Sequence, residues 1–192
     1  MRRGAWAAAI LIAAALLGWR AARRSPPVSV PGAEAKATLA LLEEILASRD
    51  DNDPRLDREF VALSSEEKGL FRAAYAARPR ERLNERGTIV YLLGRNLTAP
   101  EDWAFLREVA AEPPCLSLAD CAKPSADAGE HGDAVTLAYP SLVALRQAHR
   151  AAQEGAPADE ARSVLEAARA SKAPAVTRLA RALAPGFDKK AP

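Results

Sequence analysis

Residues 80–110 read RERLNERGTIVYLLGRNLTAPEDWAFLREVA, and apolar side chains recur there at helical spacing on both sides of a short break. The spacing predicts a helix over residues 80–96, with an inward face made of Ile89, Val90, Leu92, Leu93 and Leu97. A second helix is predicted to begin at Thr98, which is expected to cap it, with Pro100 and Glu101 in the first turn. Its apolar residues are Trp103, Leu106, Val109 and Ala110. We therefore expect a domain built from short helices joined by tight turns.

The rest of the chain shows the same pattern. Hydrophobic residues make up 49% of the 192 residues and aromatic residues only 5%. Alanine, the best helix former, is abundant, and few runs resemble strands. Further helices are predicted near residues 33–48, 56–63, 64–78 (capped by Ser64 or Ser65), 140–153, 157–171 and 174–184. We expect an all-α domain over residues 33–184, followed by a disordered tail at 185–192.

Three short motifs follow one another between Glu85 and Val109. They are Leu92-Leu93-Gly94-Arg95-Asn96-Leu97, Pro100-Glu101-Asp102 and Trp103-Ala104-Phe105-Leu106. Together they resemble a HEAT-like repeat, in which a helix ending in a Leu-Gly pattern leads through a short turn to the next helix. The resemblance implies a stack of helical pairs with a protein-binding surface and without catalytic residues. No fixed period repeats across the whole chain, so a small irregular helical bundle is the alternative.

The N-terminal unit, residues 1–24, contains a membrane-directed segment at residues 4–19. Residues 5–19, AWAAAILIAAALLGW, carry no charge. Their number, about 15, suits the apolar region of a secretory signal and is short for a span of the bilayer. Residues 18–24 are bulky or charged where a cleavage site needs small side chains. We expect a retained single-pass anchor; a cleaved signal and a membrane-surface or buried helix are the alternatives.

The charges around this segment do not decide its orientation. Two arginines precede it and three follow it, which slightly favours a cytoplasmic body. These residues are Arg2, Arg3, Arg20, Arg23 and Arg24. Residues 25–32, SPPVSVPG, hold three prolines and one glycine and are expected to form a semi-rigid tether.

Cys115 and Cys121 are the only cysteines, and they lie in a predicted loop, residues 115–139, that is too long for an ordinary connector. An even number of cysteines in a membrane-directed chain indicates a disulfide, and a disulfide indicates an oxidising compartment outside the cytoplasm. Two free thiols are one alternative. A metal site with His131, and with His149 or Asp120, is another, although zinc-binding cysteines are usually closer in sequence.

No motif identifies a catalytic or cofactor site. The sequence lacks G-x-S-x-G, H-E-x-x-H and a phosphate-binding glycine loop. His131 lies in a polar loop, and His149 lies on a predicted helix, where we expect it to be partly buried or capping. The adjacent acids Glu43-Glu44 and Glu66-Glu67 would diverge by about 100° on a helix, so they are interpreted as solvated faces.

The charge distribution argues against nucleic-acid binding. The net charge of +2 depends on the N-terminal arginines, since residues 33–139 hold 13 basic and 20 acidic residues. Residues 140–192 hold 9 basic and 5 acidic residues. No concentrated basic surface covers the domain, as binding to phosphates requires. The arginines between Arg78 and Arg86, with Glu81 and Glu85 among them, predict a salt-bridged solvent face, and an anionic-partner patch is the alternative.

The function that follows from these features is a non-enzymatic, membrane-tethered interaction domain of the bacterial cell envelope. We expect it at the inner membrane, with a periplasmic body and a protein partner. One alternative is an envelope enzyme whose site is built on the 115–139 loop with His131. Another is an adaptor tethered to the cytoplasmic face of the membrane, which reduced cysteines would indicate.

Overall fold

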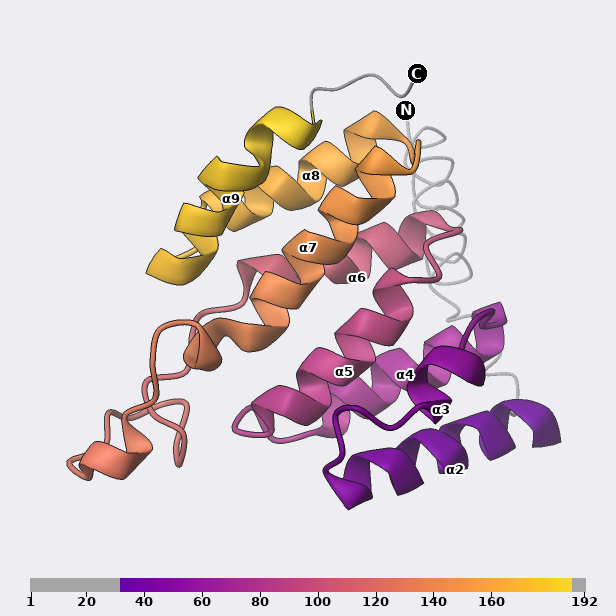
Figure 1. Ribbon diagram of the computed structural model, residues 1–192, viewed down its shortest axis with the longest axis horizontal. Coiled ribbons are helices and arrows are strands. Elements are labelled where there is room, and N and C mark those ends of the chain that lie inside the picture. The colour runs from indigo at the N-terminus through magenta and orange to yellow at the C-terminus, as the bar shows by residue number, and fades with distance from the viewer. Residues whose placement is uncertain (1–31, 188–192) are drawn as a thin grey trace, which may run out of the picture. The chain divides into compact units, whose positions relative to one another are not determined.

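The computed structural model describes residues 32–187, and within them the chain is helical with no strand. The α-helices are α2 (Ala33–Ser48), α3 (Arg55–Arg58), α4 (Ser65–Ala77), α5 (Leu83–Gly94), α6 (Pro100–Ala111), α7 (Tyr139–Gln153), α8 (Ala158–Arg169) and α9 (Pro174–Phe187), with short 3-10 turns η1 (Ala128–Glu130) and η2 (Thr136–Ala138) (Figure 1). The predicted all-α class is confirmed. No helix of this part of the chain is long and apolar enough to cross a membrane. The predicted membrane segment at residues 4–19 lies outside the described residues.

The helices pack both on their neighbours in sequence and on alternate helices. In Figure 1, α7 runs beside α5, and contacts also join α6 to α8 and α7 to α9. At the N-terminal end, α2 packs on α4 and α4 packs on α5. Between α6 and α7 the chain runs away from the packed helices and then returns to them. This segment is the long loop that the sequence predicts.

The core contains the residues whose spacing predicted an inward face. Ile89, Val90, Leu92 and Leu93 of α5 are buried, as are Trp103, Leu106 and Val109 of α6. Leu97 is only partly buried. Aromatic edge-to-face pairs join α4 to its neighbours: Phe60 with Phe71, and Tyr75 with Phe105. Burial of this apolar surface provides most of the driving force for folding.

Several helix boundaries differ from those predicted. Ser64 caps α4 through a capping box with Glu67, as predicted. Helix α5 begins at Leu83 rather than at residue 80, because residues 79–82 form a turn closed by the Arg82 amide and the Pro79 carbonyl. Helix α9 continues to Phe187, past the expected domain end at residue 184, and Phe187 is buried.

Lys68, in the first turn of α4, is buried, with 2% of its surface exposed. Its ammonium group donates to the Asn96 carbonyl oxygen at 2.6 Å, the Thr98 hydroxyl at 2.7 Å and Asp102 Oδ2 at 2.7 Å. These bonds use all three donors of the ammonium group. Because the partners lie in the α5–α6 turn and in α6, this side chain ties α4 to both helices.

Asp102 completes this network. Its carboxylate also accepts from the amides of Thr98 at 3.0 Å and Ala99 at 3.1 Å, and from Arg72 Nη1 at 2.9 Å. Burial opposes ionisation of Asp102, but the hydrogen bonds from Lys68 and the two amides outweigh it and hold the pKa of Asp102 below its usual value. The expectation that Thr98 caps α6 is wrong, because Ala99 occupies the N-cap position and the Thr98 hydroxyl accepts from Lys68 instead.

Two glycines of α5 allow the helix to lie close to α7. A Cβ atom on Gly87 would overlap the ring of Tyr139, and one on Gly94 would lie 2.5 Å from Gln147 Cβ. Since the two glycines are seven residues apart, they share one face of the helix. This close approach sets the position of α7, and of Tyr139 at its start, relative to α5.

Replacing Asp102 with alanine should lower the free energy of unfolding by about 3–5 kcal/mol, because Lys68 would stay buried without its carboxylate partner. Urea unfolding followed by circular dichroism measures this loss. The stabilisation by the Asp102 carboxylate is fully present above the pKa of an unfolded aspartate, about 4, and is lost as the pH falls through the lower pKa of the folded state. The difference in unfolding free energy between the wild type and Asp102→Ala should therefore become smaller in acid. Arg72→Gln, which removes the partly exposed partner, should cost less than about 1 kcal/mol. Equal losses in the two variants would contradict a central role for the buried pair.

Gly94→Ala should lower the free energy of unfolding by about 1–3 kcal/mol, because the new methyl group would overpack against Gln147. Gly69→Ala in α4 is the matched control, since nothing lies within 4 Å of a Cβ atom there. Alanine favours a helix over glycine by up to about 1 kcal/mol, so this variant should be stabilised. Thermal unfolding of both variants distinguishes the two effects, and stabilisation by Gly94→Ala would rule out the close α5–α7 contact.

Candidate functional site

A groove runs across the side of α5 that does not face the core, and it is formed by two adjoining cavities of about 290 and 460 Å³. The cavities share Asp51, Leu56 and Thr88 in their linings, so they form one continuous feature, which we name the α5 groove. One wall is the segment between α2 and α3, and the other comes from the long loop and the start of α7.

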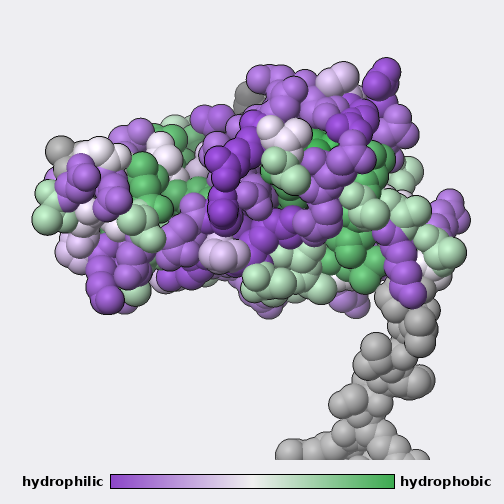
Figure 2. Space-filling model, turned by 90° about the horizontal axis from the view of Figure 1, so that it is seen from below, coloured by the Kyte–Doolittle hydropathy of each residue, from purple (hydrophilic) through white to green (hydrophobic). Residues whose placement is uncertain are grey.

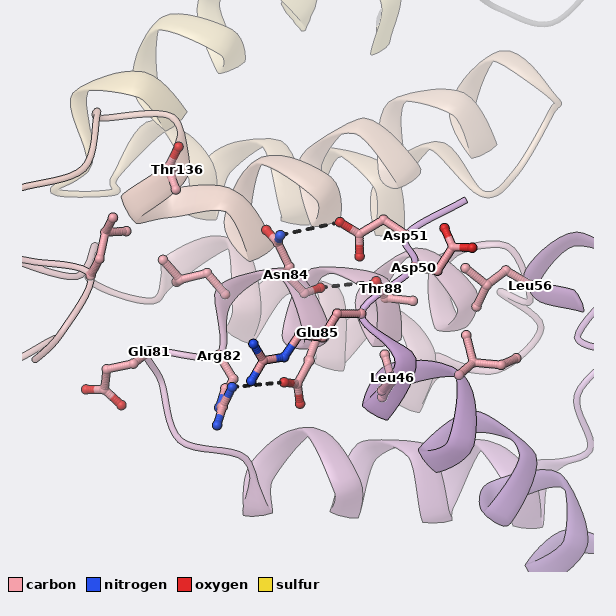
Figure 3. A pocket seen from close by; sticks show the side chains of 14 residues that line it. Leu46, Asp50, Asp51, Leu56, Glu81, Arg82, Asn84, Glu85, Thr88 and Thr136 are labelled. Atoms are coloured by element: carbon pink, nitrogen blue, oxygen red, sulfur yellow. Dashed lines mark hydrogen bonds and ion pairs between the residues drawn. The ribbon is translucent and has the colours of Figure 1, made fainter. Parts of the chain in front are cut away.

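The first cavity lies where α2 ends and α5 begins (Figure 3). Arg49 ends α2 with a φ of 56°, in the left-handed region, and turns the chain so that Asp50 and Asp51 line the cavity. Asn84 Nδ2 donates to Asp51 Oδ2 at 3.3 Å across the groove. The Thr88 hydroxyl donates to the Asn84 carbonyl oxygen at 3.1 Å and forms part of the floor.

The second cavity continues along α5 towards α7 and has an aromatic character. Tyr91 of α5 and Tyr139 of α7 both line it. The Tyr91 hydroxyl donates to Asp57 Oδ1 at 3.1 Å, and Arg95 pairs with the same oxygen at 2.7 Å. Burial and the nearby Asp51 carboxylate raise the pKa of Tyr139, which keeps the phenol neutral at physiological pH.

The carboxylates that line the groove fall into two groups. Asp53, Asp57 and Glu85 each pair with an arginine of the domain. Asp50, Asp51 and Glu81 instead accept from uncharged donors, namely the Asn52 amide at 3.0 Å, Asn84 Nδ2 at 3.3 Å and the Cys121 amide at 2.8 Å. The Cys121 amide and the backbone amide of Glu81 itself lower the pKa of Glu81, which therefore stays ionised.

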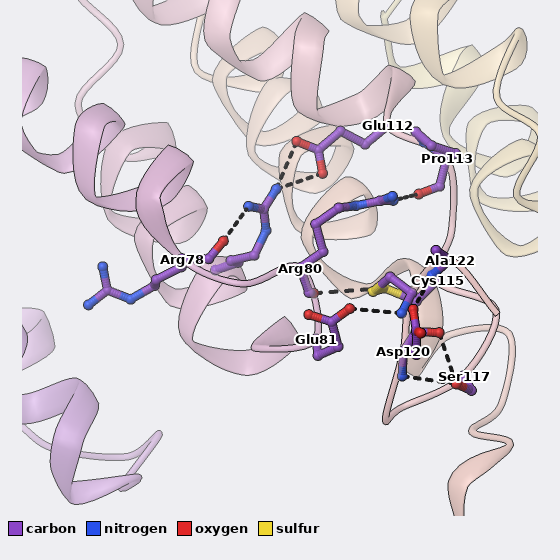
Figure 4. Close-up of a disulfide and its surroundings, with 11 residues drawn as sticks. Arg78, Arg80, Glu81, Glu112, Pro113, Cys115, Ser117, Asp120 and Ala122 are labelled. Carbon is purple, nitrogen blue, oxygen red and sulfur yellow. Dashed lines mark hydrogen bonds and ion pairs between the residues drawn. A yellow bond between two sulfur atoms is a disulfide. The ribbon is translucent and has the colours of Figure 1, made fainter. Parts of the chain in front are cut away.

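The predicted disulfide between Cys115 and Cys121 is present (Figure 4). The two cysteines and Leu83 are buried in a small apolar cluster at the start of α5, and the partly buried Leu118 and Leu137 pack against it. The Cys115 amide donates to the Leu137 carbonyl oxygen at 2.9 Å, and the Cys121 amide donates to Glu81. The disulfide loop is thereby fastened to α5, and it supplies Leu118 to the groove wall.

The two histidines lie on different elements, and neither lines the α5 groove. His131 is exposed in the loop. His149 of α7 lies against the ring of Phe187 at 5.3 Å, and burial lowers its pKa. Within the described residues, no group of three or more His, Cys, Asp or Glu side chains is arranged to hold a metal ion.

The arginines near the start of α5 are mostly paired, but not all on a solvent face. Arg78 pairs with Glu43 at 2.6 Å and Glu85 at 3.3 Å, which confirms the salt-bridged interpretation for that residue. Arg86 contradicts it, since this side chain is 5% exposed and binds both oxygens of Glu112 at 2.9 and 2.8 Å. It also lies 3.8 Å above the ring of Tyr75.

Another hollow, of about 790 Å³, lies between α4 and α6. Four arginines line it, and each donates to an acceptor of the domain. They are Arg72, Arg78, Arg80 and Arg86. Arg72, Arg78 and Arg86 pair with carboxylates, and Arg80 donates to the Pro113 carbonyl oxygen, so three of the four charges are compensated internally.

The sequence patterns did not identify the residues that form the groove. Asp50 and Asp51 follow the end of the helix predicted at residues 33–48, and Thr88, Tyr91 and Tyr139 belong to no local motif. Two signals do point towards the groove: the acidic excess of residues 33–139, and the seven-residue spacing of Gly87 and Gly94. On the face shown in Figure 2, hydrophilic side chains run across the middle of the molecule and separate smaller apolar patches.

No protein-family model matches the chain, and no curated protein or solved structure is significantly similar to it.

Replacing both cysteines with serine should release the disulfide loop locally and leave the helices in place. A closed ring this short stabilises a protein by about 2 kcal/mol. Hydrogen exchange should accelerate at the amides of Cys115, Leu118 and Cys121, which now bond within the loop or to Glu81. The wild type treated with reductant should behave like the double variant, on which reductant has no effect. Unchanged exchange in both would contradict a fastening role for the disulfide.

Proposed function

We propose that this chain is a membrane-tethered, non-enzymatic interaction domain of the bacterial cell envelope, and that the α5 groove binds a partner protein. The groove carries this proposal, because it is open, combines polar and apolar side chains, and holds three carboxylates that form no ion pair with any described residue. Its lining contains no histidine, cysteine or lysine. A lining of this kind suits binding better than nucleophilic or acid–base chemistry.

The helix packing supports an α-solenoid fragment as the architecture of the domain. In a stack of helical pairs, each helix contacts its own partner and the equivalent helix of the next pair. The contacts of α5 with α7, α6 with α8 and α7 with α9 follow this order. Solenoid folds present extended surfaces to other proteins, which agrees with a groove beside α5.

The disulfide supports a body outside the cytoplasm. Structural disulfides persist in oxidising compartments such as the periplasm and are rare in the cytosol. The tether at residues 25–32 and the membrane segment at residues 4–19 would then hold the domain at the inner membrane.

Labelling from outside spheroplasts that express the full-length protein tests both parts of this proposal. Thr88→Cys places a thiol in the groove, and Arg107→Cys places one on the exposed face of α6, outside the groove. A membrane-impermeant maleimide that carries a photo-crosslinker should label both variants. On illumination, only the groove variant should give a discrete adduct with a second protein, and Asp51→Lys in the same chain should abolish it.

The outcomes separate placement from binding. If neither thiol is labelled in intact spheroplasts but both are labelled after lysis, the envelope placement is wrong. If both are labelled but give the same diffuse adducts, the groove is not the binding surface.

A further inference from the structure

Three carboxylates that form no ion pair line the first cavity of the α5 groove. Asp50 and Asp51 come from the turn after α2, and Glu81 comes from the turn before α5. Of the six carboxylates that line the two cavities, Asp53, Asp57 and Glu85 pair with arginines. The other three, Asp50, Asp51 and Glu81, stand against two lining arginines, Arg49 and Arg146, since Arg82 is paired with Glu85. Outside its ion pairs, the lining therefore holds one more carboxylate than arginines, and it holds two adjacent acids, Asp50 and Asp51.

The shape of the groove suits an extended chain. Along α5, the lining runs from Asn84 to Tyr91, a length of about 10 Å at the rise of an α-helix. An extended chain covers that distance in about three residues, and successive side chains alternate in direction. A polypeptide segment could thus place one side chain against Asp50 and Asp51 and another against the tyrosines.

The second cavity offers an apolar and aromatic neighbourhood to that other side chain. Tyr91, Tyr139 and Val143 line it. The ring of Tyr139 is held close to α5 because residue 87 is glycine. Aromatic rings of this kind bind apolar and cationic side chains alike.

We propose that the occupant of the α5 groove is an extended, positively charged segment of a partner protein, with a Lys or Arg side chain against Asp50 and Asp51 and an apolar or aromatic residue on Tyr91 and Tyr139. This inference rests on the proposed binding function. A nucleic acid does not fit, because the lining repels phosphate. A metal ion does not fit, because the described residues hold no suitable group of ligands.

Fluorescence anisotropy with labelled eight-residue peptides, on the full-length protein in nanodiscs, tests the charge of the occupant. The probe peptide alternates Lys or Arg with Tyr or Val, and the comparison peptide replaces every basic residue with Glu. The basic peptide should bind at least about tenfold more tightly, since two or more charge pairs at a partly exposed site reach that factor. Its affinity should fall when the salt concentration rises from about 50 to about 500 mM, because salt screens exposed charges strongly over this range.

Asp50→Asn with Asp51→Asn should weaken binding of the basic peptide by about tenfold, since these changes preserve shape and hydrogen-bond acceptors while removing charge. The matched control is Asp159→Asn with Glu160→Gln, two adjacent acids of α8 outside the groove. The control should leave the affinity unchanged. Thermal unfolding of both double variants checks that each is folded.

Three outcomes would overturn the inference. If the basic and acidic peptides bind equally, or the two double variants weaken binding equally, the groove does not select positive charge. If the protein instead self-associates in a way that Asp50→Asn with Asp51→Asn abolishes, the occupant is a second copy of this chain. If Thr88→Cys still gives a discrete crosslink when any of these outcomes is found, the proposed binding function stands and only the proposed partner chemistry is rejected.

Discussion

The ion pair between Lys68 and Asp102 is the contact on which the arrangement of the helices depends. Both side chains are buried, and a buried charge is tolerated only when its partners are complete. Lys68 satisfies its donors with groups of the α5–α6 turn and α6, while Asp102 also accepts from the amides of Thr98 and Ala99 in that turn. Because the pair fixes α4 against α5 and α6, it also fixes the two helices on which α7 and α8 pack.

Helix α5 belongs to this group of packed helices and also lines the groove. One side of the helix carries Gly87 and Gly94 and approaches α7, while Asn84, Thr88 and Tyr91 line the groove. The same close approach brings Tyr139 to the groove wall. The disulfide loop adds Leu118 from the other end, since Glu81 holds the Cys121 amide. The groove is therefore assembled from segments that are far apart in sequence and meet only on α5.

Features with a local cause were predictable from the sequence. Helical spacing identified Ile89 and Leu92 as core residues, the Ser64 cap follows from its capping box, and the number of cysteines indicated the disulfide. Features with a distant cause were not. Lys68 follows two glutamates in a first turn, where exposure is the ordinary expectation, and its burial depends on a partner 34 residues later. Arg86 is buried for the same reason, through Glu112.

The charges that line the α5 groove bear on what the groove can bind. Arg55, Arg78, Arg86 and Arg95 are each matched by a carboxylate. Asp50 and Asp51 are adjacent acids without such a match, and their carboxylates accept only from uncharged donors, the Asn52 amide and Asn84 Nδ2. Local choices that disagree with stability tend to occur at functional sites, where a ligand supplies the missing interaction. A cationic side chain from a partner would supply the ion pair that these two acids lack in the free domain, so binding would add an interaction that folding leaves unmade.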